Sequence, residues 1–309
     1  MAAAVLAAGR PASAQQPRPF ISLPPWAVAR NVAWPEQARL AAKVGYAGID
    51  WAFGPARTAG ADATKALFAE LKIQPTIVNL PMQNALGPDD AAFQAQLPKL
   101  AEDAAFTAAI GCHRFMLVLS ATTLNGQSKE DRWRLVRDRL TAISGVLRPH
   151  NIALGLEFLG PLVFRTGRRG GAPPATPPVP FVYTLPETVK LAAEAGPNIG
   201  VVLDAWHWYH SGGTTAEIRA TDKSRIVHVH VSDAKPMPAE EVADNMRWLP
   251  GEGVIDLVGF FQALKAIGYA GGASPETIGP RIPDTMPPEE SARLALEATQ
   301  SVMRKAGVI

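Results

Sequence analysis

The sequence reads IALGLEF at 152–158, IGVVLD at 199–204, RIVHVHV at 225–231 and GGASPE at 271–276. Each segment has the length and the apolar or small residues of a buried strand. Each also ends at or near a residue that can bind a divalent metal ion, namely Glu157, Asp204, His230 and Glu276. Because the carboxyl ends of the strands in a parallel barrel meet at one mouth, this order predicts a metal centre there.

The whole chain alternates short apolar runs with longer helical patterns. Four further strands are expected at 19–23, 47–53, 75–80 and 113–120, and helices at 35–44, 63–71, 89–110, 129–149, 186–195, 214–220, 256–267 and 288–305. Eight strand–helix units within 309 residues favour an α/β fold, a (β/α)8 TIM barrel in a single domain over residues 17–309. A doubly wound open sheet usually has nearer six strands. Two long insertions, 160–183 and 232–253, follow barrel strands at the end where loops build active sites.

The composition limits the classes of partner. The chain is 47% hydrophobic with a formal net charge of only +2, so we expect neither nucleic acid nor a membrane surface as a partner. No segment approaches the ~20 apolar residues of a membrane span. A single cysteine, Cys112, excludes an internal disulfide and a cysteine-rich zinc module. We expect a small-molecule substrate, and a homo-oligomer stays possible.

The first 16 residues, MAAAVLAAGRPASAQQ, form a separate segment. A short apolar run precedes Ala12-Ser13-Ala14, a small-x-small pattern that resembles the cleavage site of an export signal. We expect residues 1–16 to be an export-signal remnant or a disordered tail. The first interpretation predicts a periplasmic or exported protein, and the second a cytoplasmic one.

Each proposed metal ligand also has a simpler explanation. A glutamate such as Glu157 could cap a loop or pair with an arginine, and Asp204 could be the N-cap of the next helix. In the strand HVHV, His228 and His230 point to the same side, which leaves Val227, Val229 and Val231 to face the helices. We expect His230, nearer the carboxyl end, to be a ligand, and His228 to support it from one layer deeper.

Besides His228, which is also a candidate for substrate contact, five other residues are such candidates: His207, Trp206, Trp208, Lys235 and Trp51. His207 follows Asp204 in a DxxH turn, where it could bind the ion or a substrate hydroxyl. The neighbouring tryptophans could stack on the apolar faces of a sugar, although aromatic residues in such positions more often pack in the core.

Carboxylates plus one imidazole make an oxygen-rich ligand set. Such a set favours Mn²⁺ or Co²⁺, with Mg²⁺ or Zn²⁺ possible. An ion chelated by a carbonyl and an adjacent hydroxyl would stabilise an enediolate. Glu157 and Glu276 could then act as the catalytic acid and base on the two faces of the substrate.

The runs GLEFLGP, FVYTL, VVLDAWHWY, HVHVSDA and LPGEGVIDLVGFFQALKAIGYAGGASPE resemble the sugar phosphate isomerase/epimerase family with a xylose isomerase-like TIM barrel. Its relatives include ketose 3-epimerases and inosose isomerases and dehydratases. The resemblance covers residues 153–280 and implies Glu157, Asp204, His230 and Glu276 as ligands, with His207 at the substrate. The arginine that ketose 3-epimerases carry six positions after the ligand histidine is Pro236 here, which argues against a 3-epimerase. No histidine precedes His113, which argues against the endonuclease branch with its three-metal cluster.

These observations favour a divalent-metal-dependent isomerase or epimerase of an unphosphorylated sugar, keto-sugar or cyclitol. A lyase could use the same site, for inosose dehydration or β-elimination from a 3-keto-glycoside. A sugar-binding barrel without catalytic activity is the third hypothesis.

Overall fold

The computed structural model of the chain describes residues 18–124, 126–166 and 178–309. The segment 1–16, for which we expected an export signal or a disordered tail, lies outside the described residues, as does much of the insertion 160–183. No helix in the described ranges is both long and apolar enough to cross a membrane.

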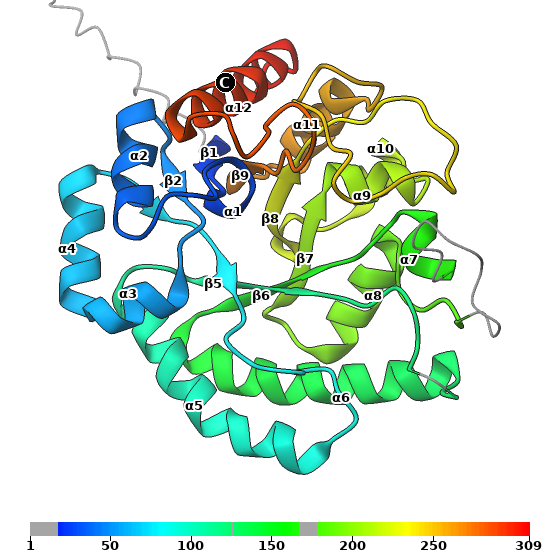
Figure 1. Ribbon diagram of the computed structural model, residues 1–309. Helices are drawn as coiled ribbons and strands as arrows, with labels where there is room; N and C mark the ends of the chain where they lie inside the picture. The colour runs from blue at the N-terminus through cyan, green and yellow to red at the C-terminus, as the bar shows by residue number, and fades with distance from the viewer. Residues whose placement is uncertain (1–17, 125, 167–177) are drawn as a thin grey trace, which may run out of the picture.

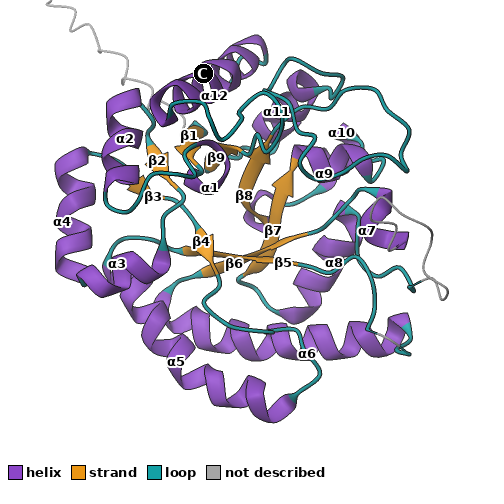
Figure 2. Ribbon diagram, viewed as in Figure 1, coloured by secondary structure: helices purple, strands orange, loops and turns teal. Residues whose placement is uncertain are grey.

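Parallel strands form the centre of the molecule (Figure 2). The strands are β1 (Phe20–Leu23), β2 (Gly48–Ile49), β3 (Gln74–Pro75), β4 (Val78–Asn79), β5 (Arg114–Val118), β6 (Ala153–Glu157), β7 (Ile199–Asp204), β8 (Ile226–Val231) and β9 (Gly272–Pro275). Their order in the sheet is β3-β2-β1-β9-β8-β7-β6-β5-β4. The first and last strands of the chain therefore pair directly, Phe20 with Gly272 and Ile21 with Ala273.

The sheet closes through β3 and β4, which are two pieces of one barrel strand. Only Thr76 and Ile77 separate them, and the backbone stays bonded to both neighbours: Thr76 N–H donates to Ile49 (2.8 Å) and Leu80 N–H donates to Met116 (2.8 Å). Counting the two pieces together gives eight barrel strands. The TIM barrel expected from the sequence is thereby confirmed, with its third strand broken in the middle.

Helices surround this ring of strands (Figure 1). They are α1 (Pro25–Val28), α2 (Glu36–Val44), α3 (Phe53–Ala59), α4 (Ala61–Leu71), α5 (Asp90–Ala109), α6 (Lys129–Leu147), α7 (Leu162–Thr166), α8 (Leu185–Ala195), α9 (Ala205–His210), α10 (Thr215–Ala220), α11 (Leu257–Ala266) and α12 (Pro288–Lys305). Five of them begin behind a side chain that accepts the backbone N–H three residues later: Asp89, Ser128, Thr184, Thr214 and Asp256. Such caps satisfy backbone donors that the first helical turn leaves unpaired.

The expected strand at 47–53 is wrong in its extent. Only Gly48–Ile49 is strand, because Phe53 already begins α3, which the sequence pattern did not reveal. The short helices α1, α7 and α9 were also not expected. Helix α9 begins directly after β7, and α1 and α7 follow β1 and β6 after a short connection. All three therefore begin at the carboxyl-end mouth of the barrel.

The prediction that Val227 faces the helices is wrong as well. The register between β7 and β8 shifts between Val201 and Val202, so that Val201 pairs with Ile226 but Val202 pairs with His228. Such a bulge inserts one residue into a strand and changes the direction of its side chains. Val227 consequently packs with Ile77, Met116 and Val202 in a small cluster separate from the main core.

Gly272 lets β9 approach its neighbours closely. A Cβ atom there would lie 2.5 Å from Thr76 Cγ2 and 3.0 Å from His228 Cε1. We expect Gly272→Ala to destabilise the protein by about 1–3 kcal/mol, because neither neighbour can move freely inside the barrel. The free energy of unfolding in urea measures this effect. Gly54→Ala is the matched control: its Cβ would meet nothing within 4 Å, so a similar loss there would contradict the steric explanation.

Candidate metal centre

Four side chains meet at the carboxyl-end mouth of the barrel. Glu157 and Asp204 are the last residues of β6 and β7, His230 lies near the end of β8, and Glu276 directly follows β9. One potential ligand atom from each lies within 4.8 Å of those of the other three. All four residues are buried, with exposed fractions between 0 and 7%. The residues chosen from the sequence are thus brought together in one place.

The imidazole of His230 lies between the two glutamates. Its Nδ1 atom is 2.8 Å from Glu157 Oε1 and 3.1 Å from Glu276 Oε2. Burial by itself lowers the pKa of His230, but the nearby charges of Glu276 and Glu157 outweigh it and hold the pKa well above its usual value. Since a metal ligand must present a neutral nitrogen, an ion bound here would take the place of the Nδ1 proton.

Arg247 is a cationic partner of Asp204 and Glu276. Its Nη1 donates to Asp204 Oδ2 (2.7 Å) and to Glu276 Oε2 (2.9 Å), and its Nη2 donates to Asp244 Oδ1 (2.8 Å). The Arg247 side chain is almost completely buried. Sequence reasoning missed this residue, although it lies in the insertion 232–253 that was expected to build the active site. The available signal was electrostatic, because three buried carboxylates require a nearby cation.

Asp233 fixes the loop that carries Arg247. Its side chain accepts three backbone N–H groups, from Ala234 (2.9 Å), Gly251 (2.9 Å) and Ile255 (3.0 Å). Its own backbone forms a two-way bridge with Trp248, the residue after Arg247. Because its buried carboxylate accepts three backbone hydrogen bonds, Asp233 fixes the path of the loop that carries Arg247.

The two glutamates have different environments. Burial raises the pKa of Glu157, and its contact with His230 only partly opposes that shift. Burial acts in the same direction on Glu276, but Arg247 and His230 overcome it and hold its pKa well below the usual range. The indole N–H of Trp26, on α1, also donates to Glu276 Oε1 (3.2 Å). Trp26 is a second residue that sequence reasoning missed.

The charge balance of this cluster fits a divalent cation. Glu157, Asp204 and Glu276 carry three negative charges when ionised, against one permanent positive charge on Arg247. With His230 neutral, the buried cluster keeps an excess of two negative charges, which a divalent ion would neutralise. The donor set of three carboxylates and one imidazole also suits Mn²⁺, Co²⁺, Mg²⁺ or Zn²⁺.

The predicted substrate residues occupy different surroundings. His207 lies beside the cluster, with its Nε2 atom 3.2 Å from Arg247 Nη2 and 3.6 Å from Asp204 Oδ2. Trp206 is buried under the guanidinium group of Arg247, whose Cζ atom is 5.7 Å from the ring centre. Both residues belong to α9, which Asp204 begins by accepting the backbone N–H of Trp206 (2.8 Å).

The other three candidates are engaged in packing contacts. Trp208 lies against Phe260 of α11, with ring centres 5.3 Å apart. The ammonium group of Lys235 lies 4.4 Å from the ring centre of Trp248. Trp51 is buried beside Phe53 (5.6 Å between ring centres).

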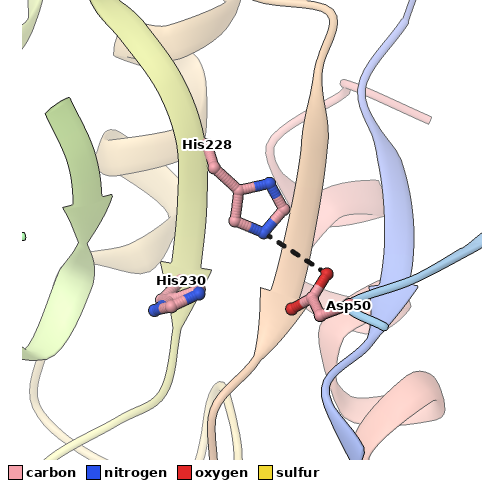
Figure 3. A group of neighbouring side chains, drawn as sticks. All are labelled: Asp50, His228 and His230. Atoms are coloured by element: carbon pink, nitrogen blue, oxygen red, sulfur yellow. Dashed lines mark ion pairs between the residues drawn. The ribbon is translucent and has the colours of Figure 1, made fainter. Parts of the chain in front are cut away.

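A second polar group lies in the barrel interior beside the metal centre. Figure 3 shows Asp50 and His228 close to His230. His228 Nε2 is 2.8 Å from Ser274 Oγ and 3.8 Å from Asp50 Oδ1. Burial raises the pKa of Asp50 to about 7, although His230 and two serine hydroxyls oppose the shift. Asp50 is a third residue that sequence reasoning missed.

The role of Arg247 in compensating charge can be tested without any activity assay. We expect Arg247→Met to lower the free energy of unfolding of the metal-free protein by roughly 3–5 kcal/mol, because it leaves buried carboxylates unpaired. Added Mn²⁺ should recover part of the loss, since an ion that binds only the folded state stabilises it. Arg281→Met, which breaks a partly exposed pair with Glu252, is the control and should cost less, about 1 kcal/mol. Equal losses in the two variants would contradict the assignment.

Known proteins share this architecture. Residues 38–302 match the family model described as the xylose isomerase-like TIM barrel. An inosose isomerase of Bacillus velezensis is 26% identical over 193 residues, which are 62% of this chain and 63% of that protein, slightly less than two thirds of its length. A 3-dehydroshikimate dehydratase of Pseudomonas putida is 35% identical over 99 residues, which are 31% of this chain and 15% of that protein.

A solved structure shows the same fold over nearly the whole chain. The crystal structure of the IolI protein with a bound zinc atom aligns with a TM-score of 0.74 at 22% identity, covering 93% of this chain and 98% of that one. Because the family model spans most of the sequence and the strands close into the expected barrel, the chain belongs to the xylose isomerase-like TIM barrel family.

Proposed function

We propose that this protein is a divalent-metal-dependent isomerase or epimerase of an unphosphorylated sugar, keto-sugar or cyclitol. The observation that carries the proposal is the placement of Glu157 and Glu276. They come from barrel strands that are not adjacent, yet both reach the same imidazole nitrogen, at 2.8 and 3.1 Å. Two carboxylates that approach one point from different sides can exchange protons with two faces of one substrate.

The different surroundings of the glutamates suggest their roles. Glu276, held by Arg247 and Trp26, is ionised and suited to take the proton from the carbon next to the carbonyl. Glu157 has no arginine contact among the described residues, and burial raises its pKa, so it holds a proton more readily than Glu276 and is suited to return one on the opposite face. Pairs of carboxyl groups whose pKa values are pushed apart commonly divide acid and base work in this way.

A divalent ion held by Glu157, Asp204, His230 and Glu276 would supply electrostatic stabilisation of the negative charge that builds up on the substrate oxygens. The ligand set favours Mn²⁺ or Co²⁺, and Zn²⁺ is supported by the zinc in the IolI structure. We expect His207, which lies next to Arg247, to donate to a substrate hydroxyl.

The substrate class follows from charge and from the relatives. Arg247, the arginine in contact with the cluster, is already bonded to Asp204, Glu276 and Asp244 and is not free to bind a phosphate group, which favours an unphosphorylated ligand. The inosose isomerase relative supports a cyclitol or a keto-sugar of similar size.

A lyase is the second candidate. Removal of the same proton, followed by loss of a hydroxyl or an aglycone from the next carbon, would give dehydration or β-elimination. The local similarity to a 3-dehydroshikimate dehydratase supports this reaction. A binding barrel without catalysis is the third candidate.

Incubation of the metal-loaded protein with keto-sugars and inososes in D₂O separates the three candidates. An isomerase or epimerase should incorporate deuterium next to the carbonyl and leave the carbon skeleton and its substituents intact, whereas a lyase should release water or an aglycone. Treatment with EDTA should abolish turnover, and Mn²⁺ or Co²⁺ should restore it. Mass spectrometry and NMR of the products measure both effects. Binding without any deuterium incorporation would support the non-catalytic barrel.

The glutamate pair gives a direct mutational test. We expect Glu157→Gln and Glu276→Gln each to lower kcat by about 10²–10⁴-fold, because an amide can neither accept nor deliver the transferred proton. Circular dichroism should show an intact fold. Glu297→Gln, at an exposed position of α12, is the control and should behave as the wild type. Normal turnover in either active-site variant would refute the acid/base assignment.

A further inference from the structure

Asp50 directly follows β2 and is buried inside the barrel, with 1% of its surface exposed. The Oδ1 atom of Asp50 accepts a hydrogen bond from Ser22 Oγ (2.7 Å). Its Oδ2 atom is buried and has no hydrogen-bond partner among the described residues. One acceptor of this carboxylate is therefore left for a further donor, and buried acceptors of this kind are rarely left unpaired.

His230 has a buried ring nitrogen without a hydrogen-bond partner. Its Nδ1 atom faces Glu157 and Glu276, while its Nε2 atom is buried and also lacks a partner in the described part of the chain. An imidazole that binds a metal ion through one nitrogen carries a hydrogen on the other, and that N–H is normally held by a carboxylate, a carbonyl or a water.

These two groups are close together. Side-chain nitrogen or oxygen atoms of Asp50, His228 and His230 lie within 4.8 Å of one another. In Figure 3 an ion pair joins Asp50 to His228, and the imidazole of His230 lies further along the same strand, β8. The His228 nitrogen that faces Asp50, Nε2, already contacts Ser274 Oγ, whereas His230 Nε2 has no partner among the described residues; His228 Nδ1 also lacks one.

We propose that Asp50 is a positioning residue for the metal centre. Its Oδ2 atom accepts, through one water molecule, the hydrogen bond that His230 Nε2–H donates. This contact fixes the ring with Nδ1 toward Glu157 and Glu276 and makes the imidazole a stronger ligand. The inference rests on the proposed metal-dependent function. The cluster of Asp50, His228 and His230 could instead hold a second ion, but Ser22 and Ser274 already occupy the facing atoms of Asp50 and His228.

Asp50→Asn tests the proposal, because the two side chains have the same shape and differ in charge. Titration calorimetry with Mn²⁺ and with Co²⁺ should show binding to one site that is about 10–100-fold weaker than in the wild type. The absorption spectrum of the Co²⁺ form should change, and NMR of ¹⁵N-labelled histidine should show a weaker hydrogen bond at His230 Nε2. A purely structural role would leave these two spectra unchanged.

Asp103→Asn is the matched control. Asp103 is also a fully buried carboxylate, but it pairs with Lys99 (2.7 Å) on α5. Its variant should lose thermal stability and keep the wild-type ion affinity and Co²⁺ spectrum.

The alternative outcomes are distinct. Unchanged affinity and unchanged spectra in Asp50→Asn would overturn the positioning role alone, even with an active wild type. Two bound ions in the wild type and one in Asp50→Asn would overturn it in favour of a second metal site. A wild type that binds no ion would overturn both this inference and the metal dependence of the proposed function.

Discussion

Mutual repulsion among three buried carboxylates is the constraint on which the mouth of this barrel depends. Glu157, Asp204 and Glu276 are taken out of water within a few ångströms of each other, and that arrangement is costly without positive charge nearby. The structure provides this charge in two forms. Arg247 binds two of the carboxylates, and the Nδ1 proton of His230 lies between the two glutamates.

The parts of the site come from different layers of the fold. Barrel strands supply the four potential ligands, because their ends are fixed by the sheet. A loop supplies Arg247 and the short helix α1 supplies Trp26, and these two residues distinguish Glu276 from Glu157. The barrel interior supplies Asp50 and His228. Because the two glutamates have different neighbours, the pKa of Glu157 is raised and the pKa of Glu276 is lowered, although the side chains are chemically identical and lie close together.

Much of this arrangement could be predicted from the sequence, and the exceptions have physical reasons. A strand end such as Asp204 can be recognised because it directly follows a run of apolar residues. Parallel strands must also end on the same side of a barrel. Arg247 could not be found in this way, since its position depends on the path of a loop that Asp233 fixes through backbone contacts.

Local irregularities were also hidden from the sequence pattern. Alternation along β8 placed Val227 among the helix-facing residues, but a register shift with β7 turned it into the barrel. The extent of the second strand was misjudged for a similar reason. Apolar residues at 47–53 fit a strand, but the chain turns into α3 after only two paired residues.

The pairing of β1 with β9 has a consequence for biosynthesis. The ribosome makes Glu276 after Glu157, Asp204 and His230, and the seam that holds β9 needs β1, the first strand in the sheet by chain order. A nascent chain therefore lacks a full set of donors for an ion until β9 has been made. Because such distant segments must first find one another, capture of a cation would follow closure of the barrel and could not guide its early collapse.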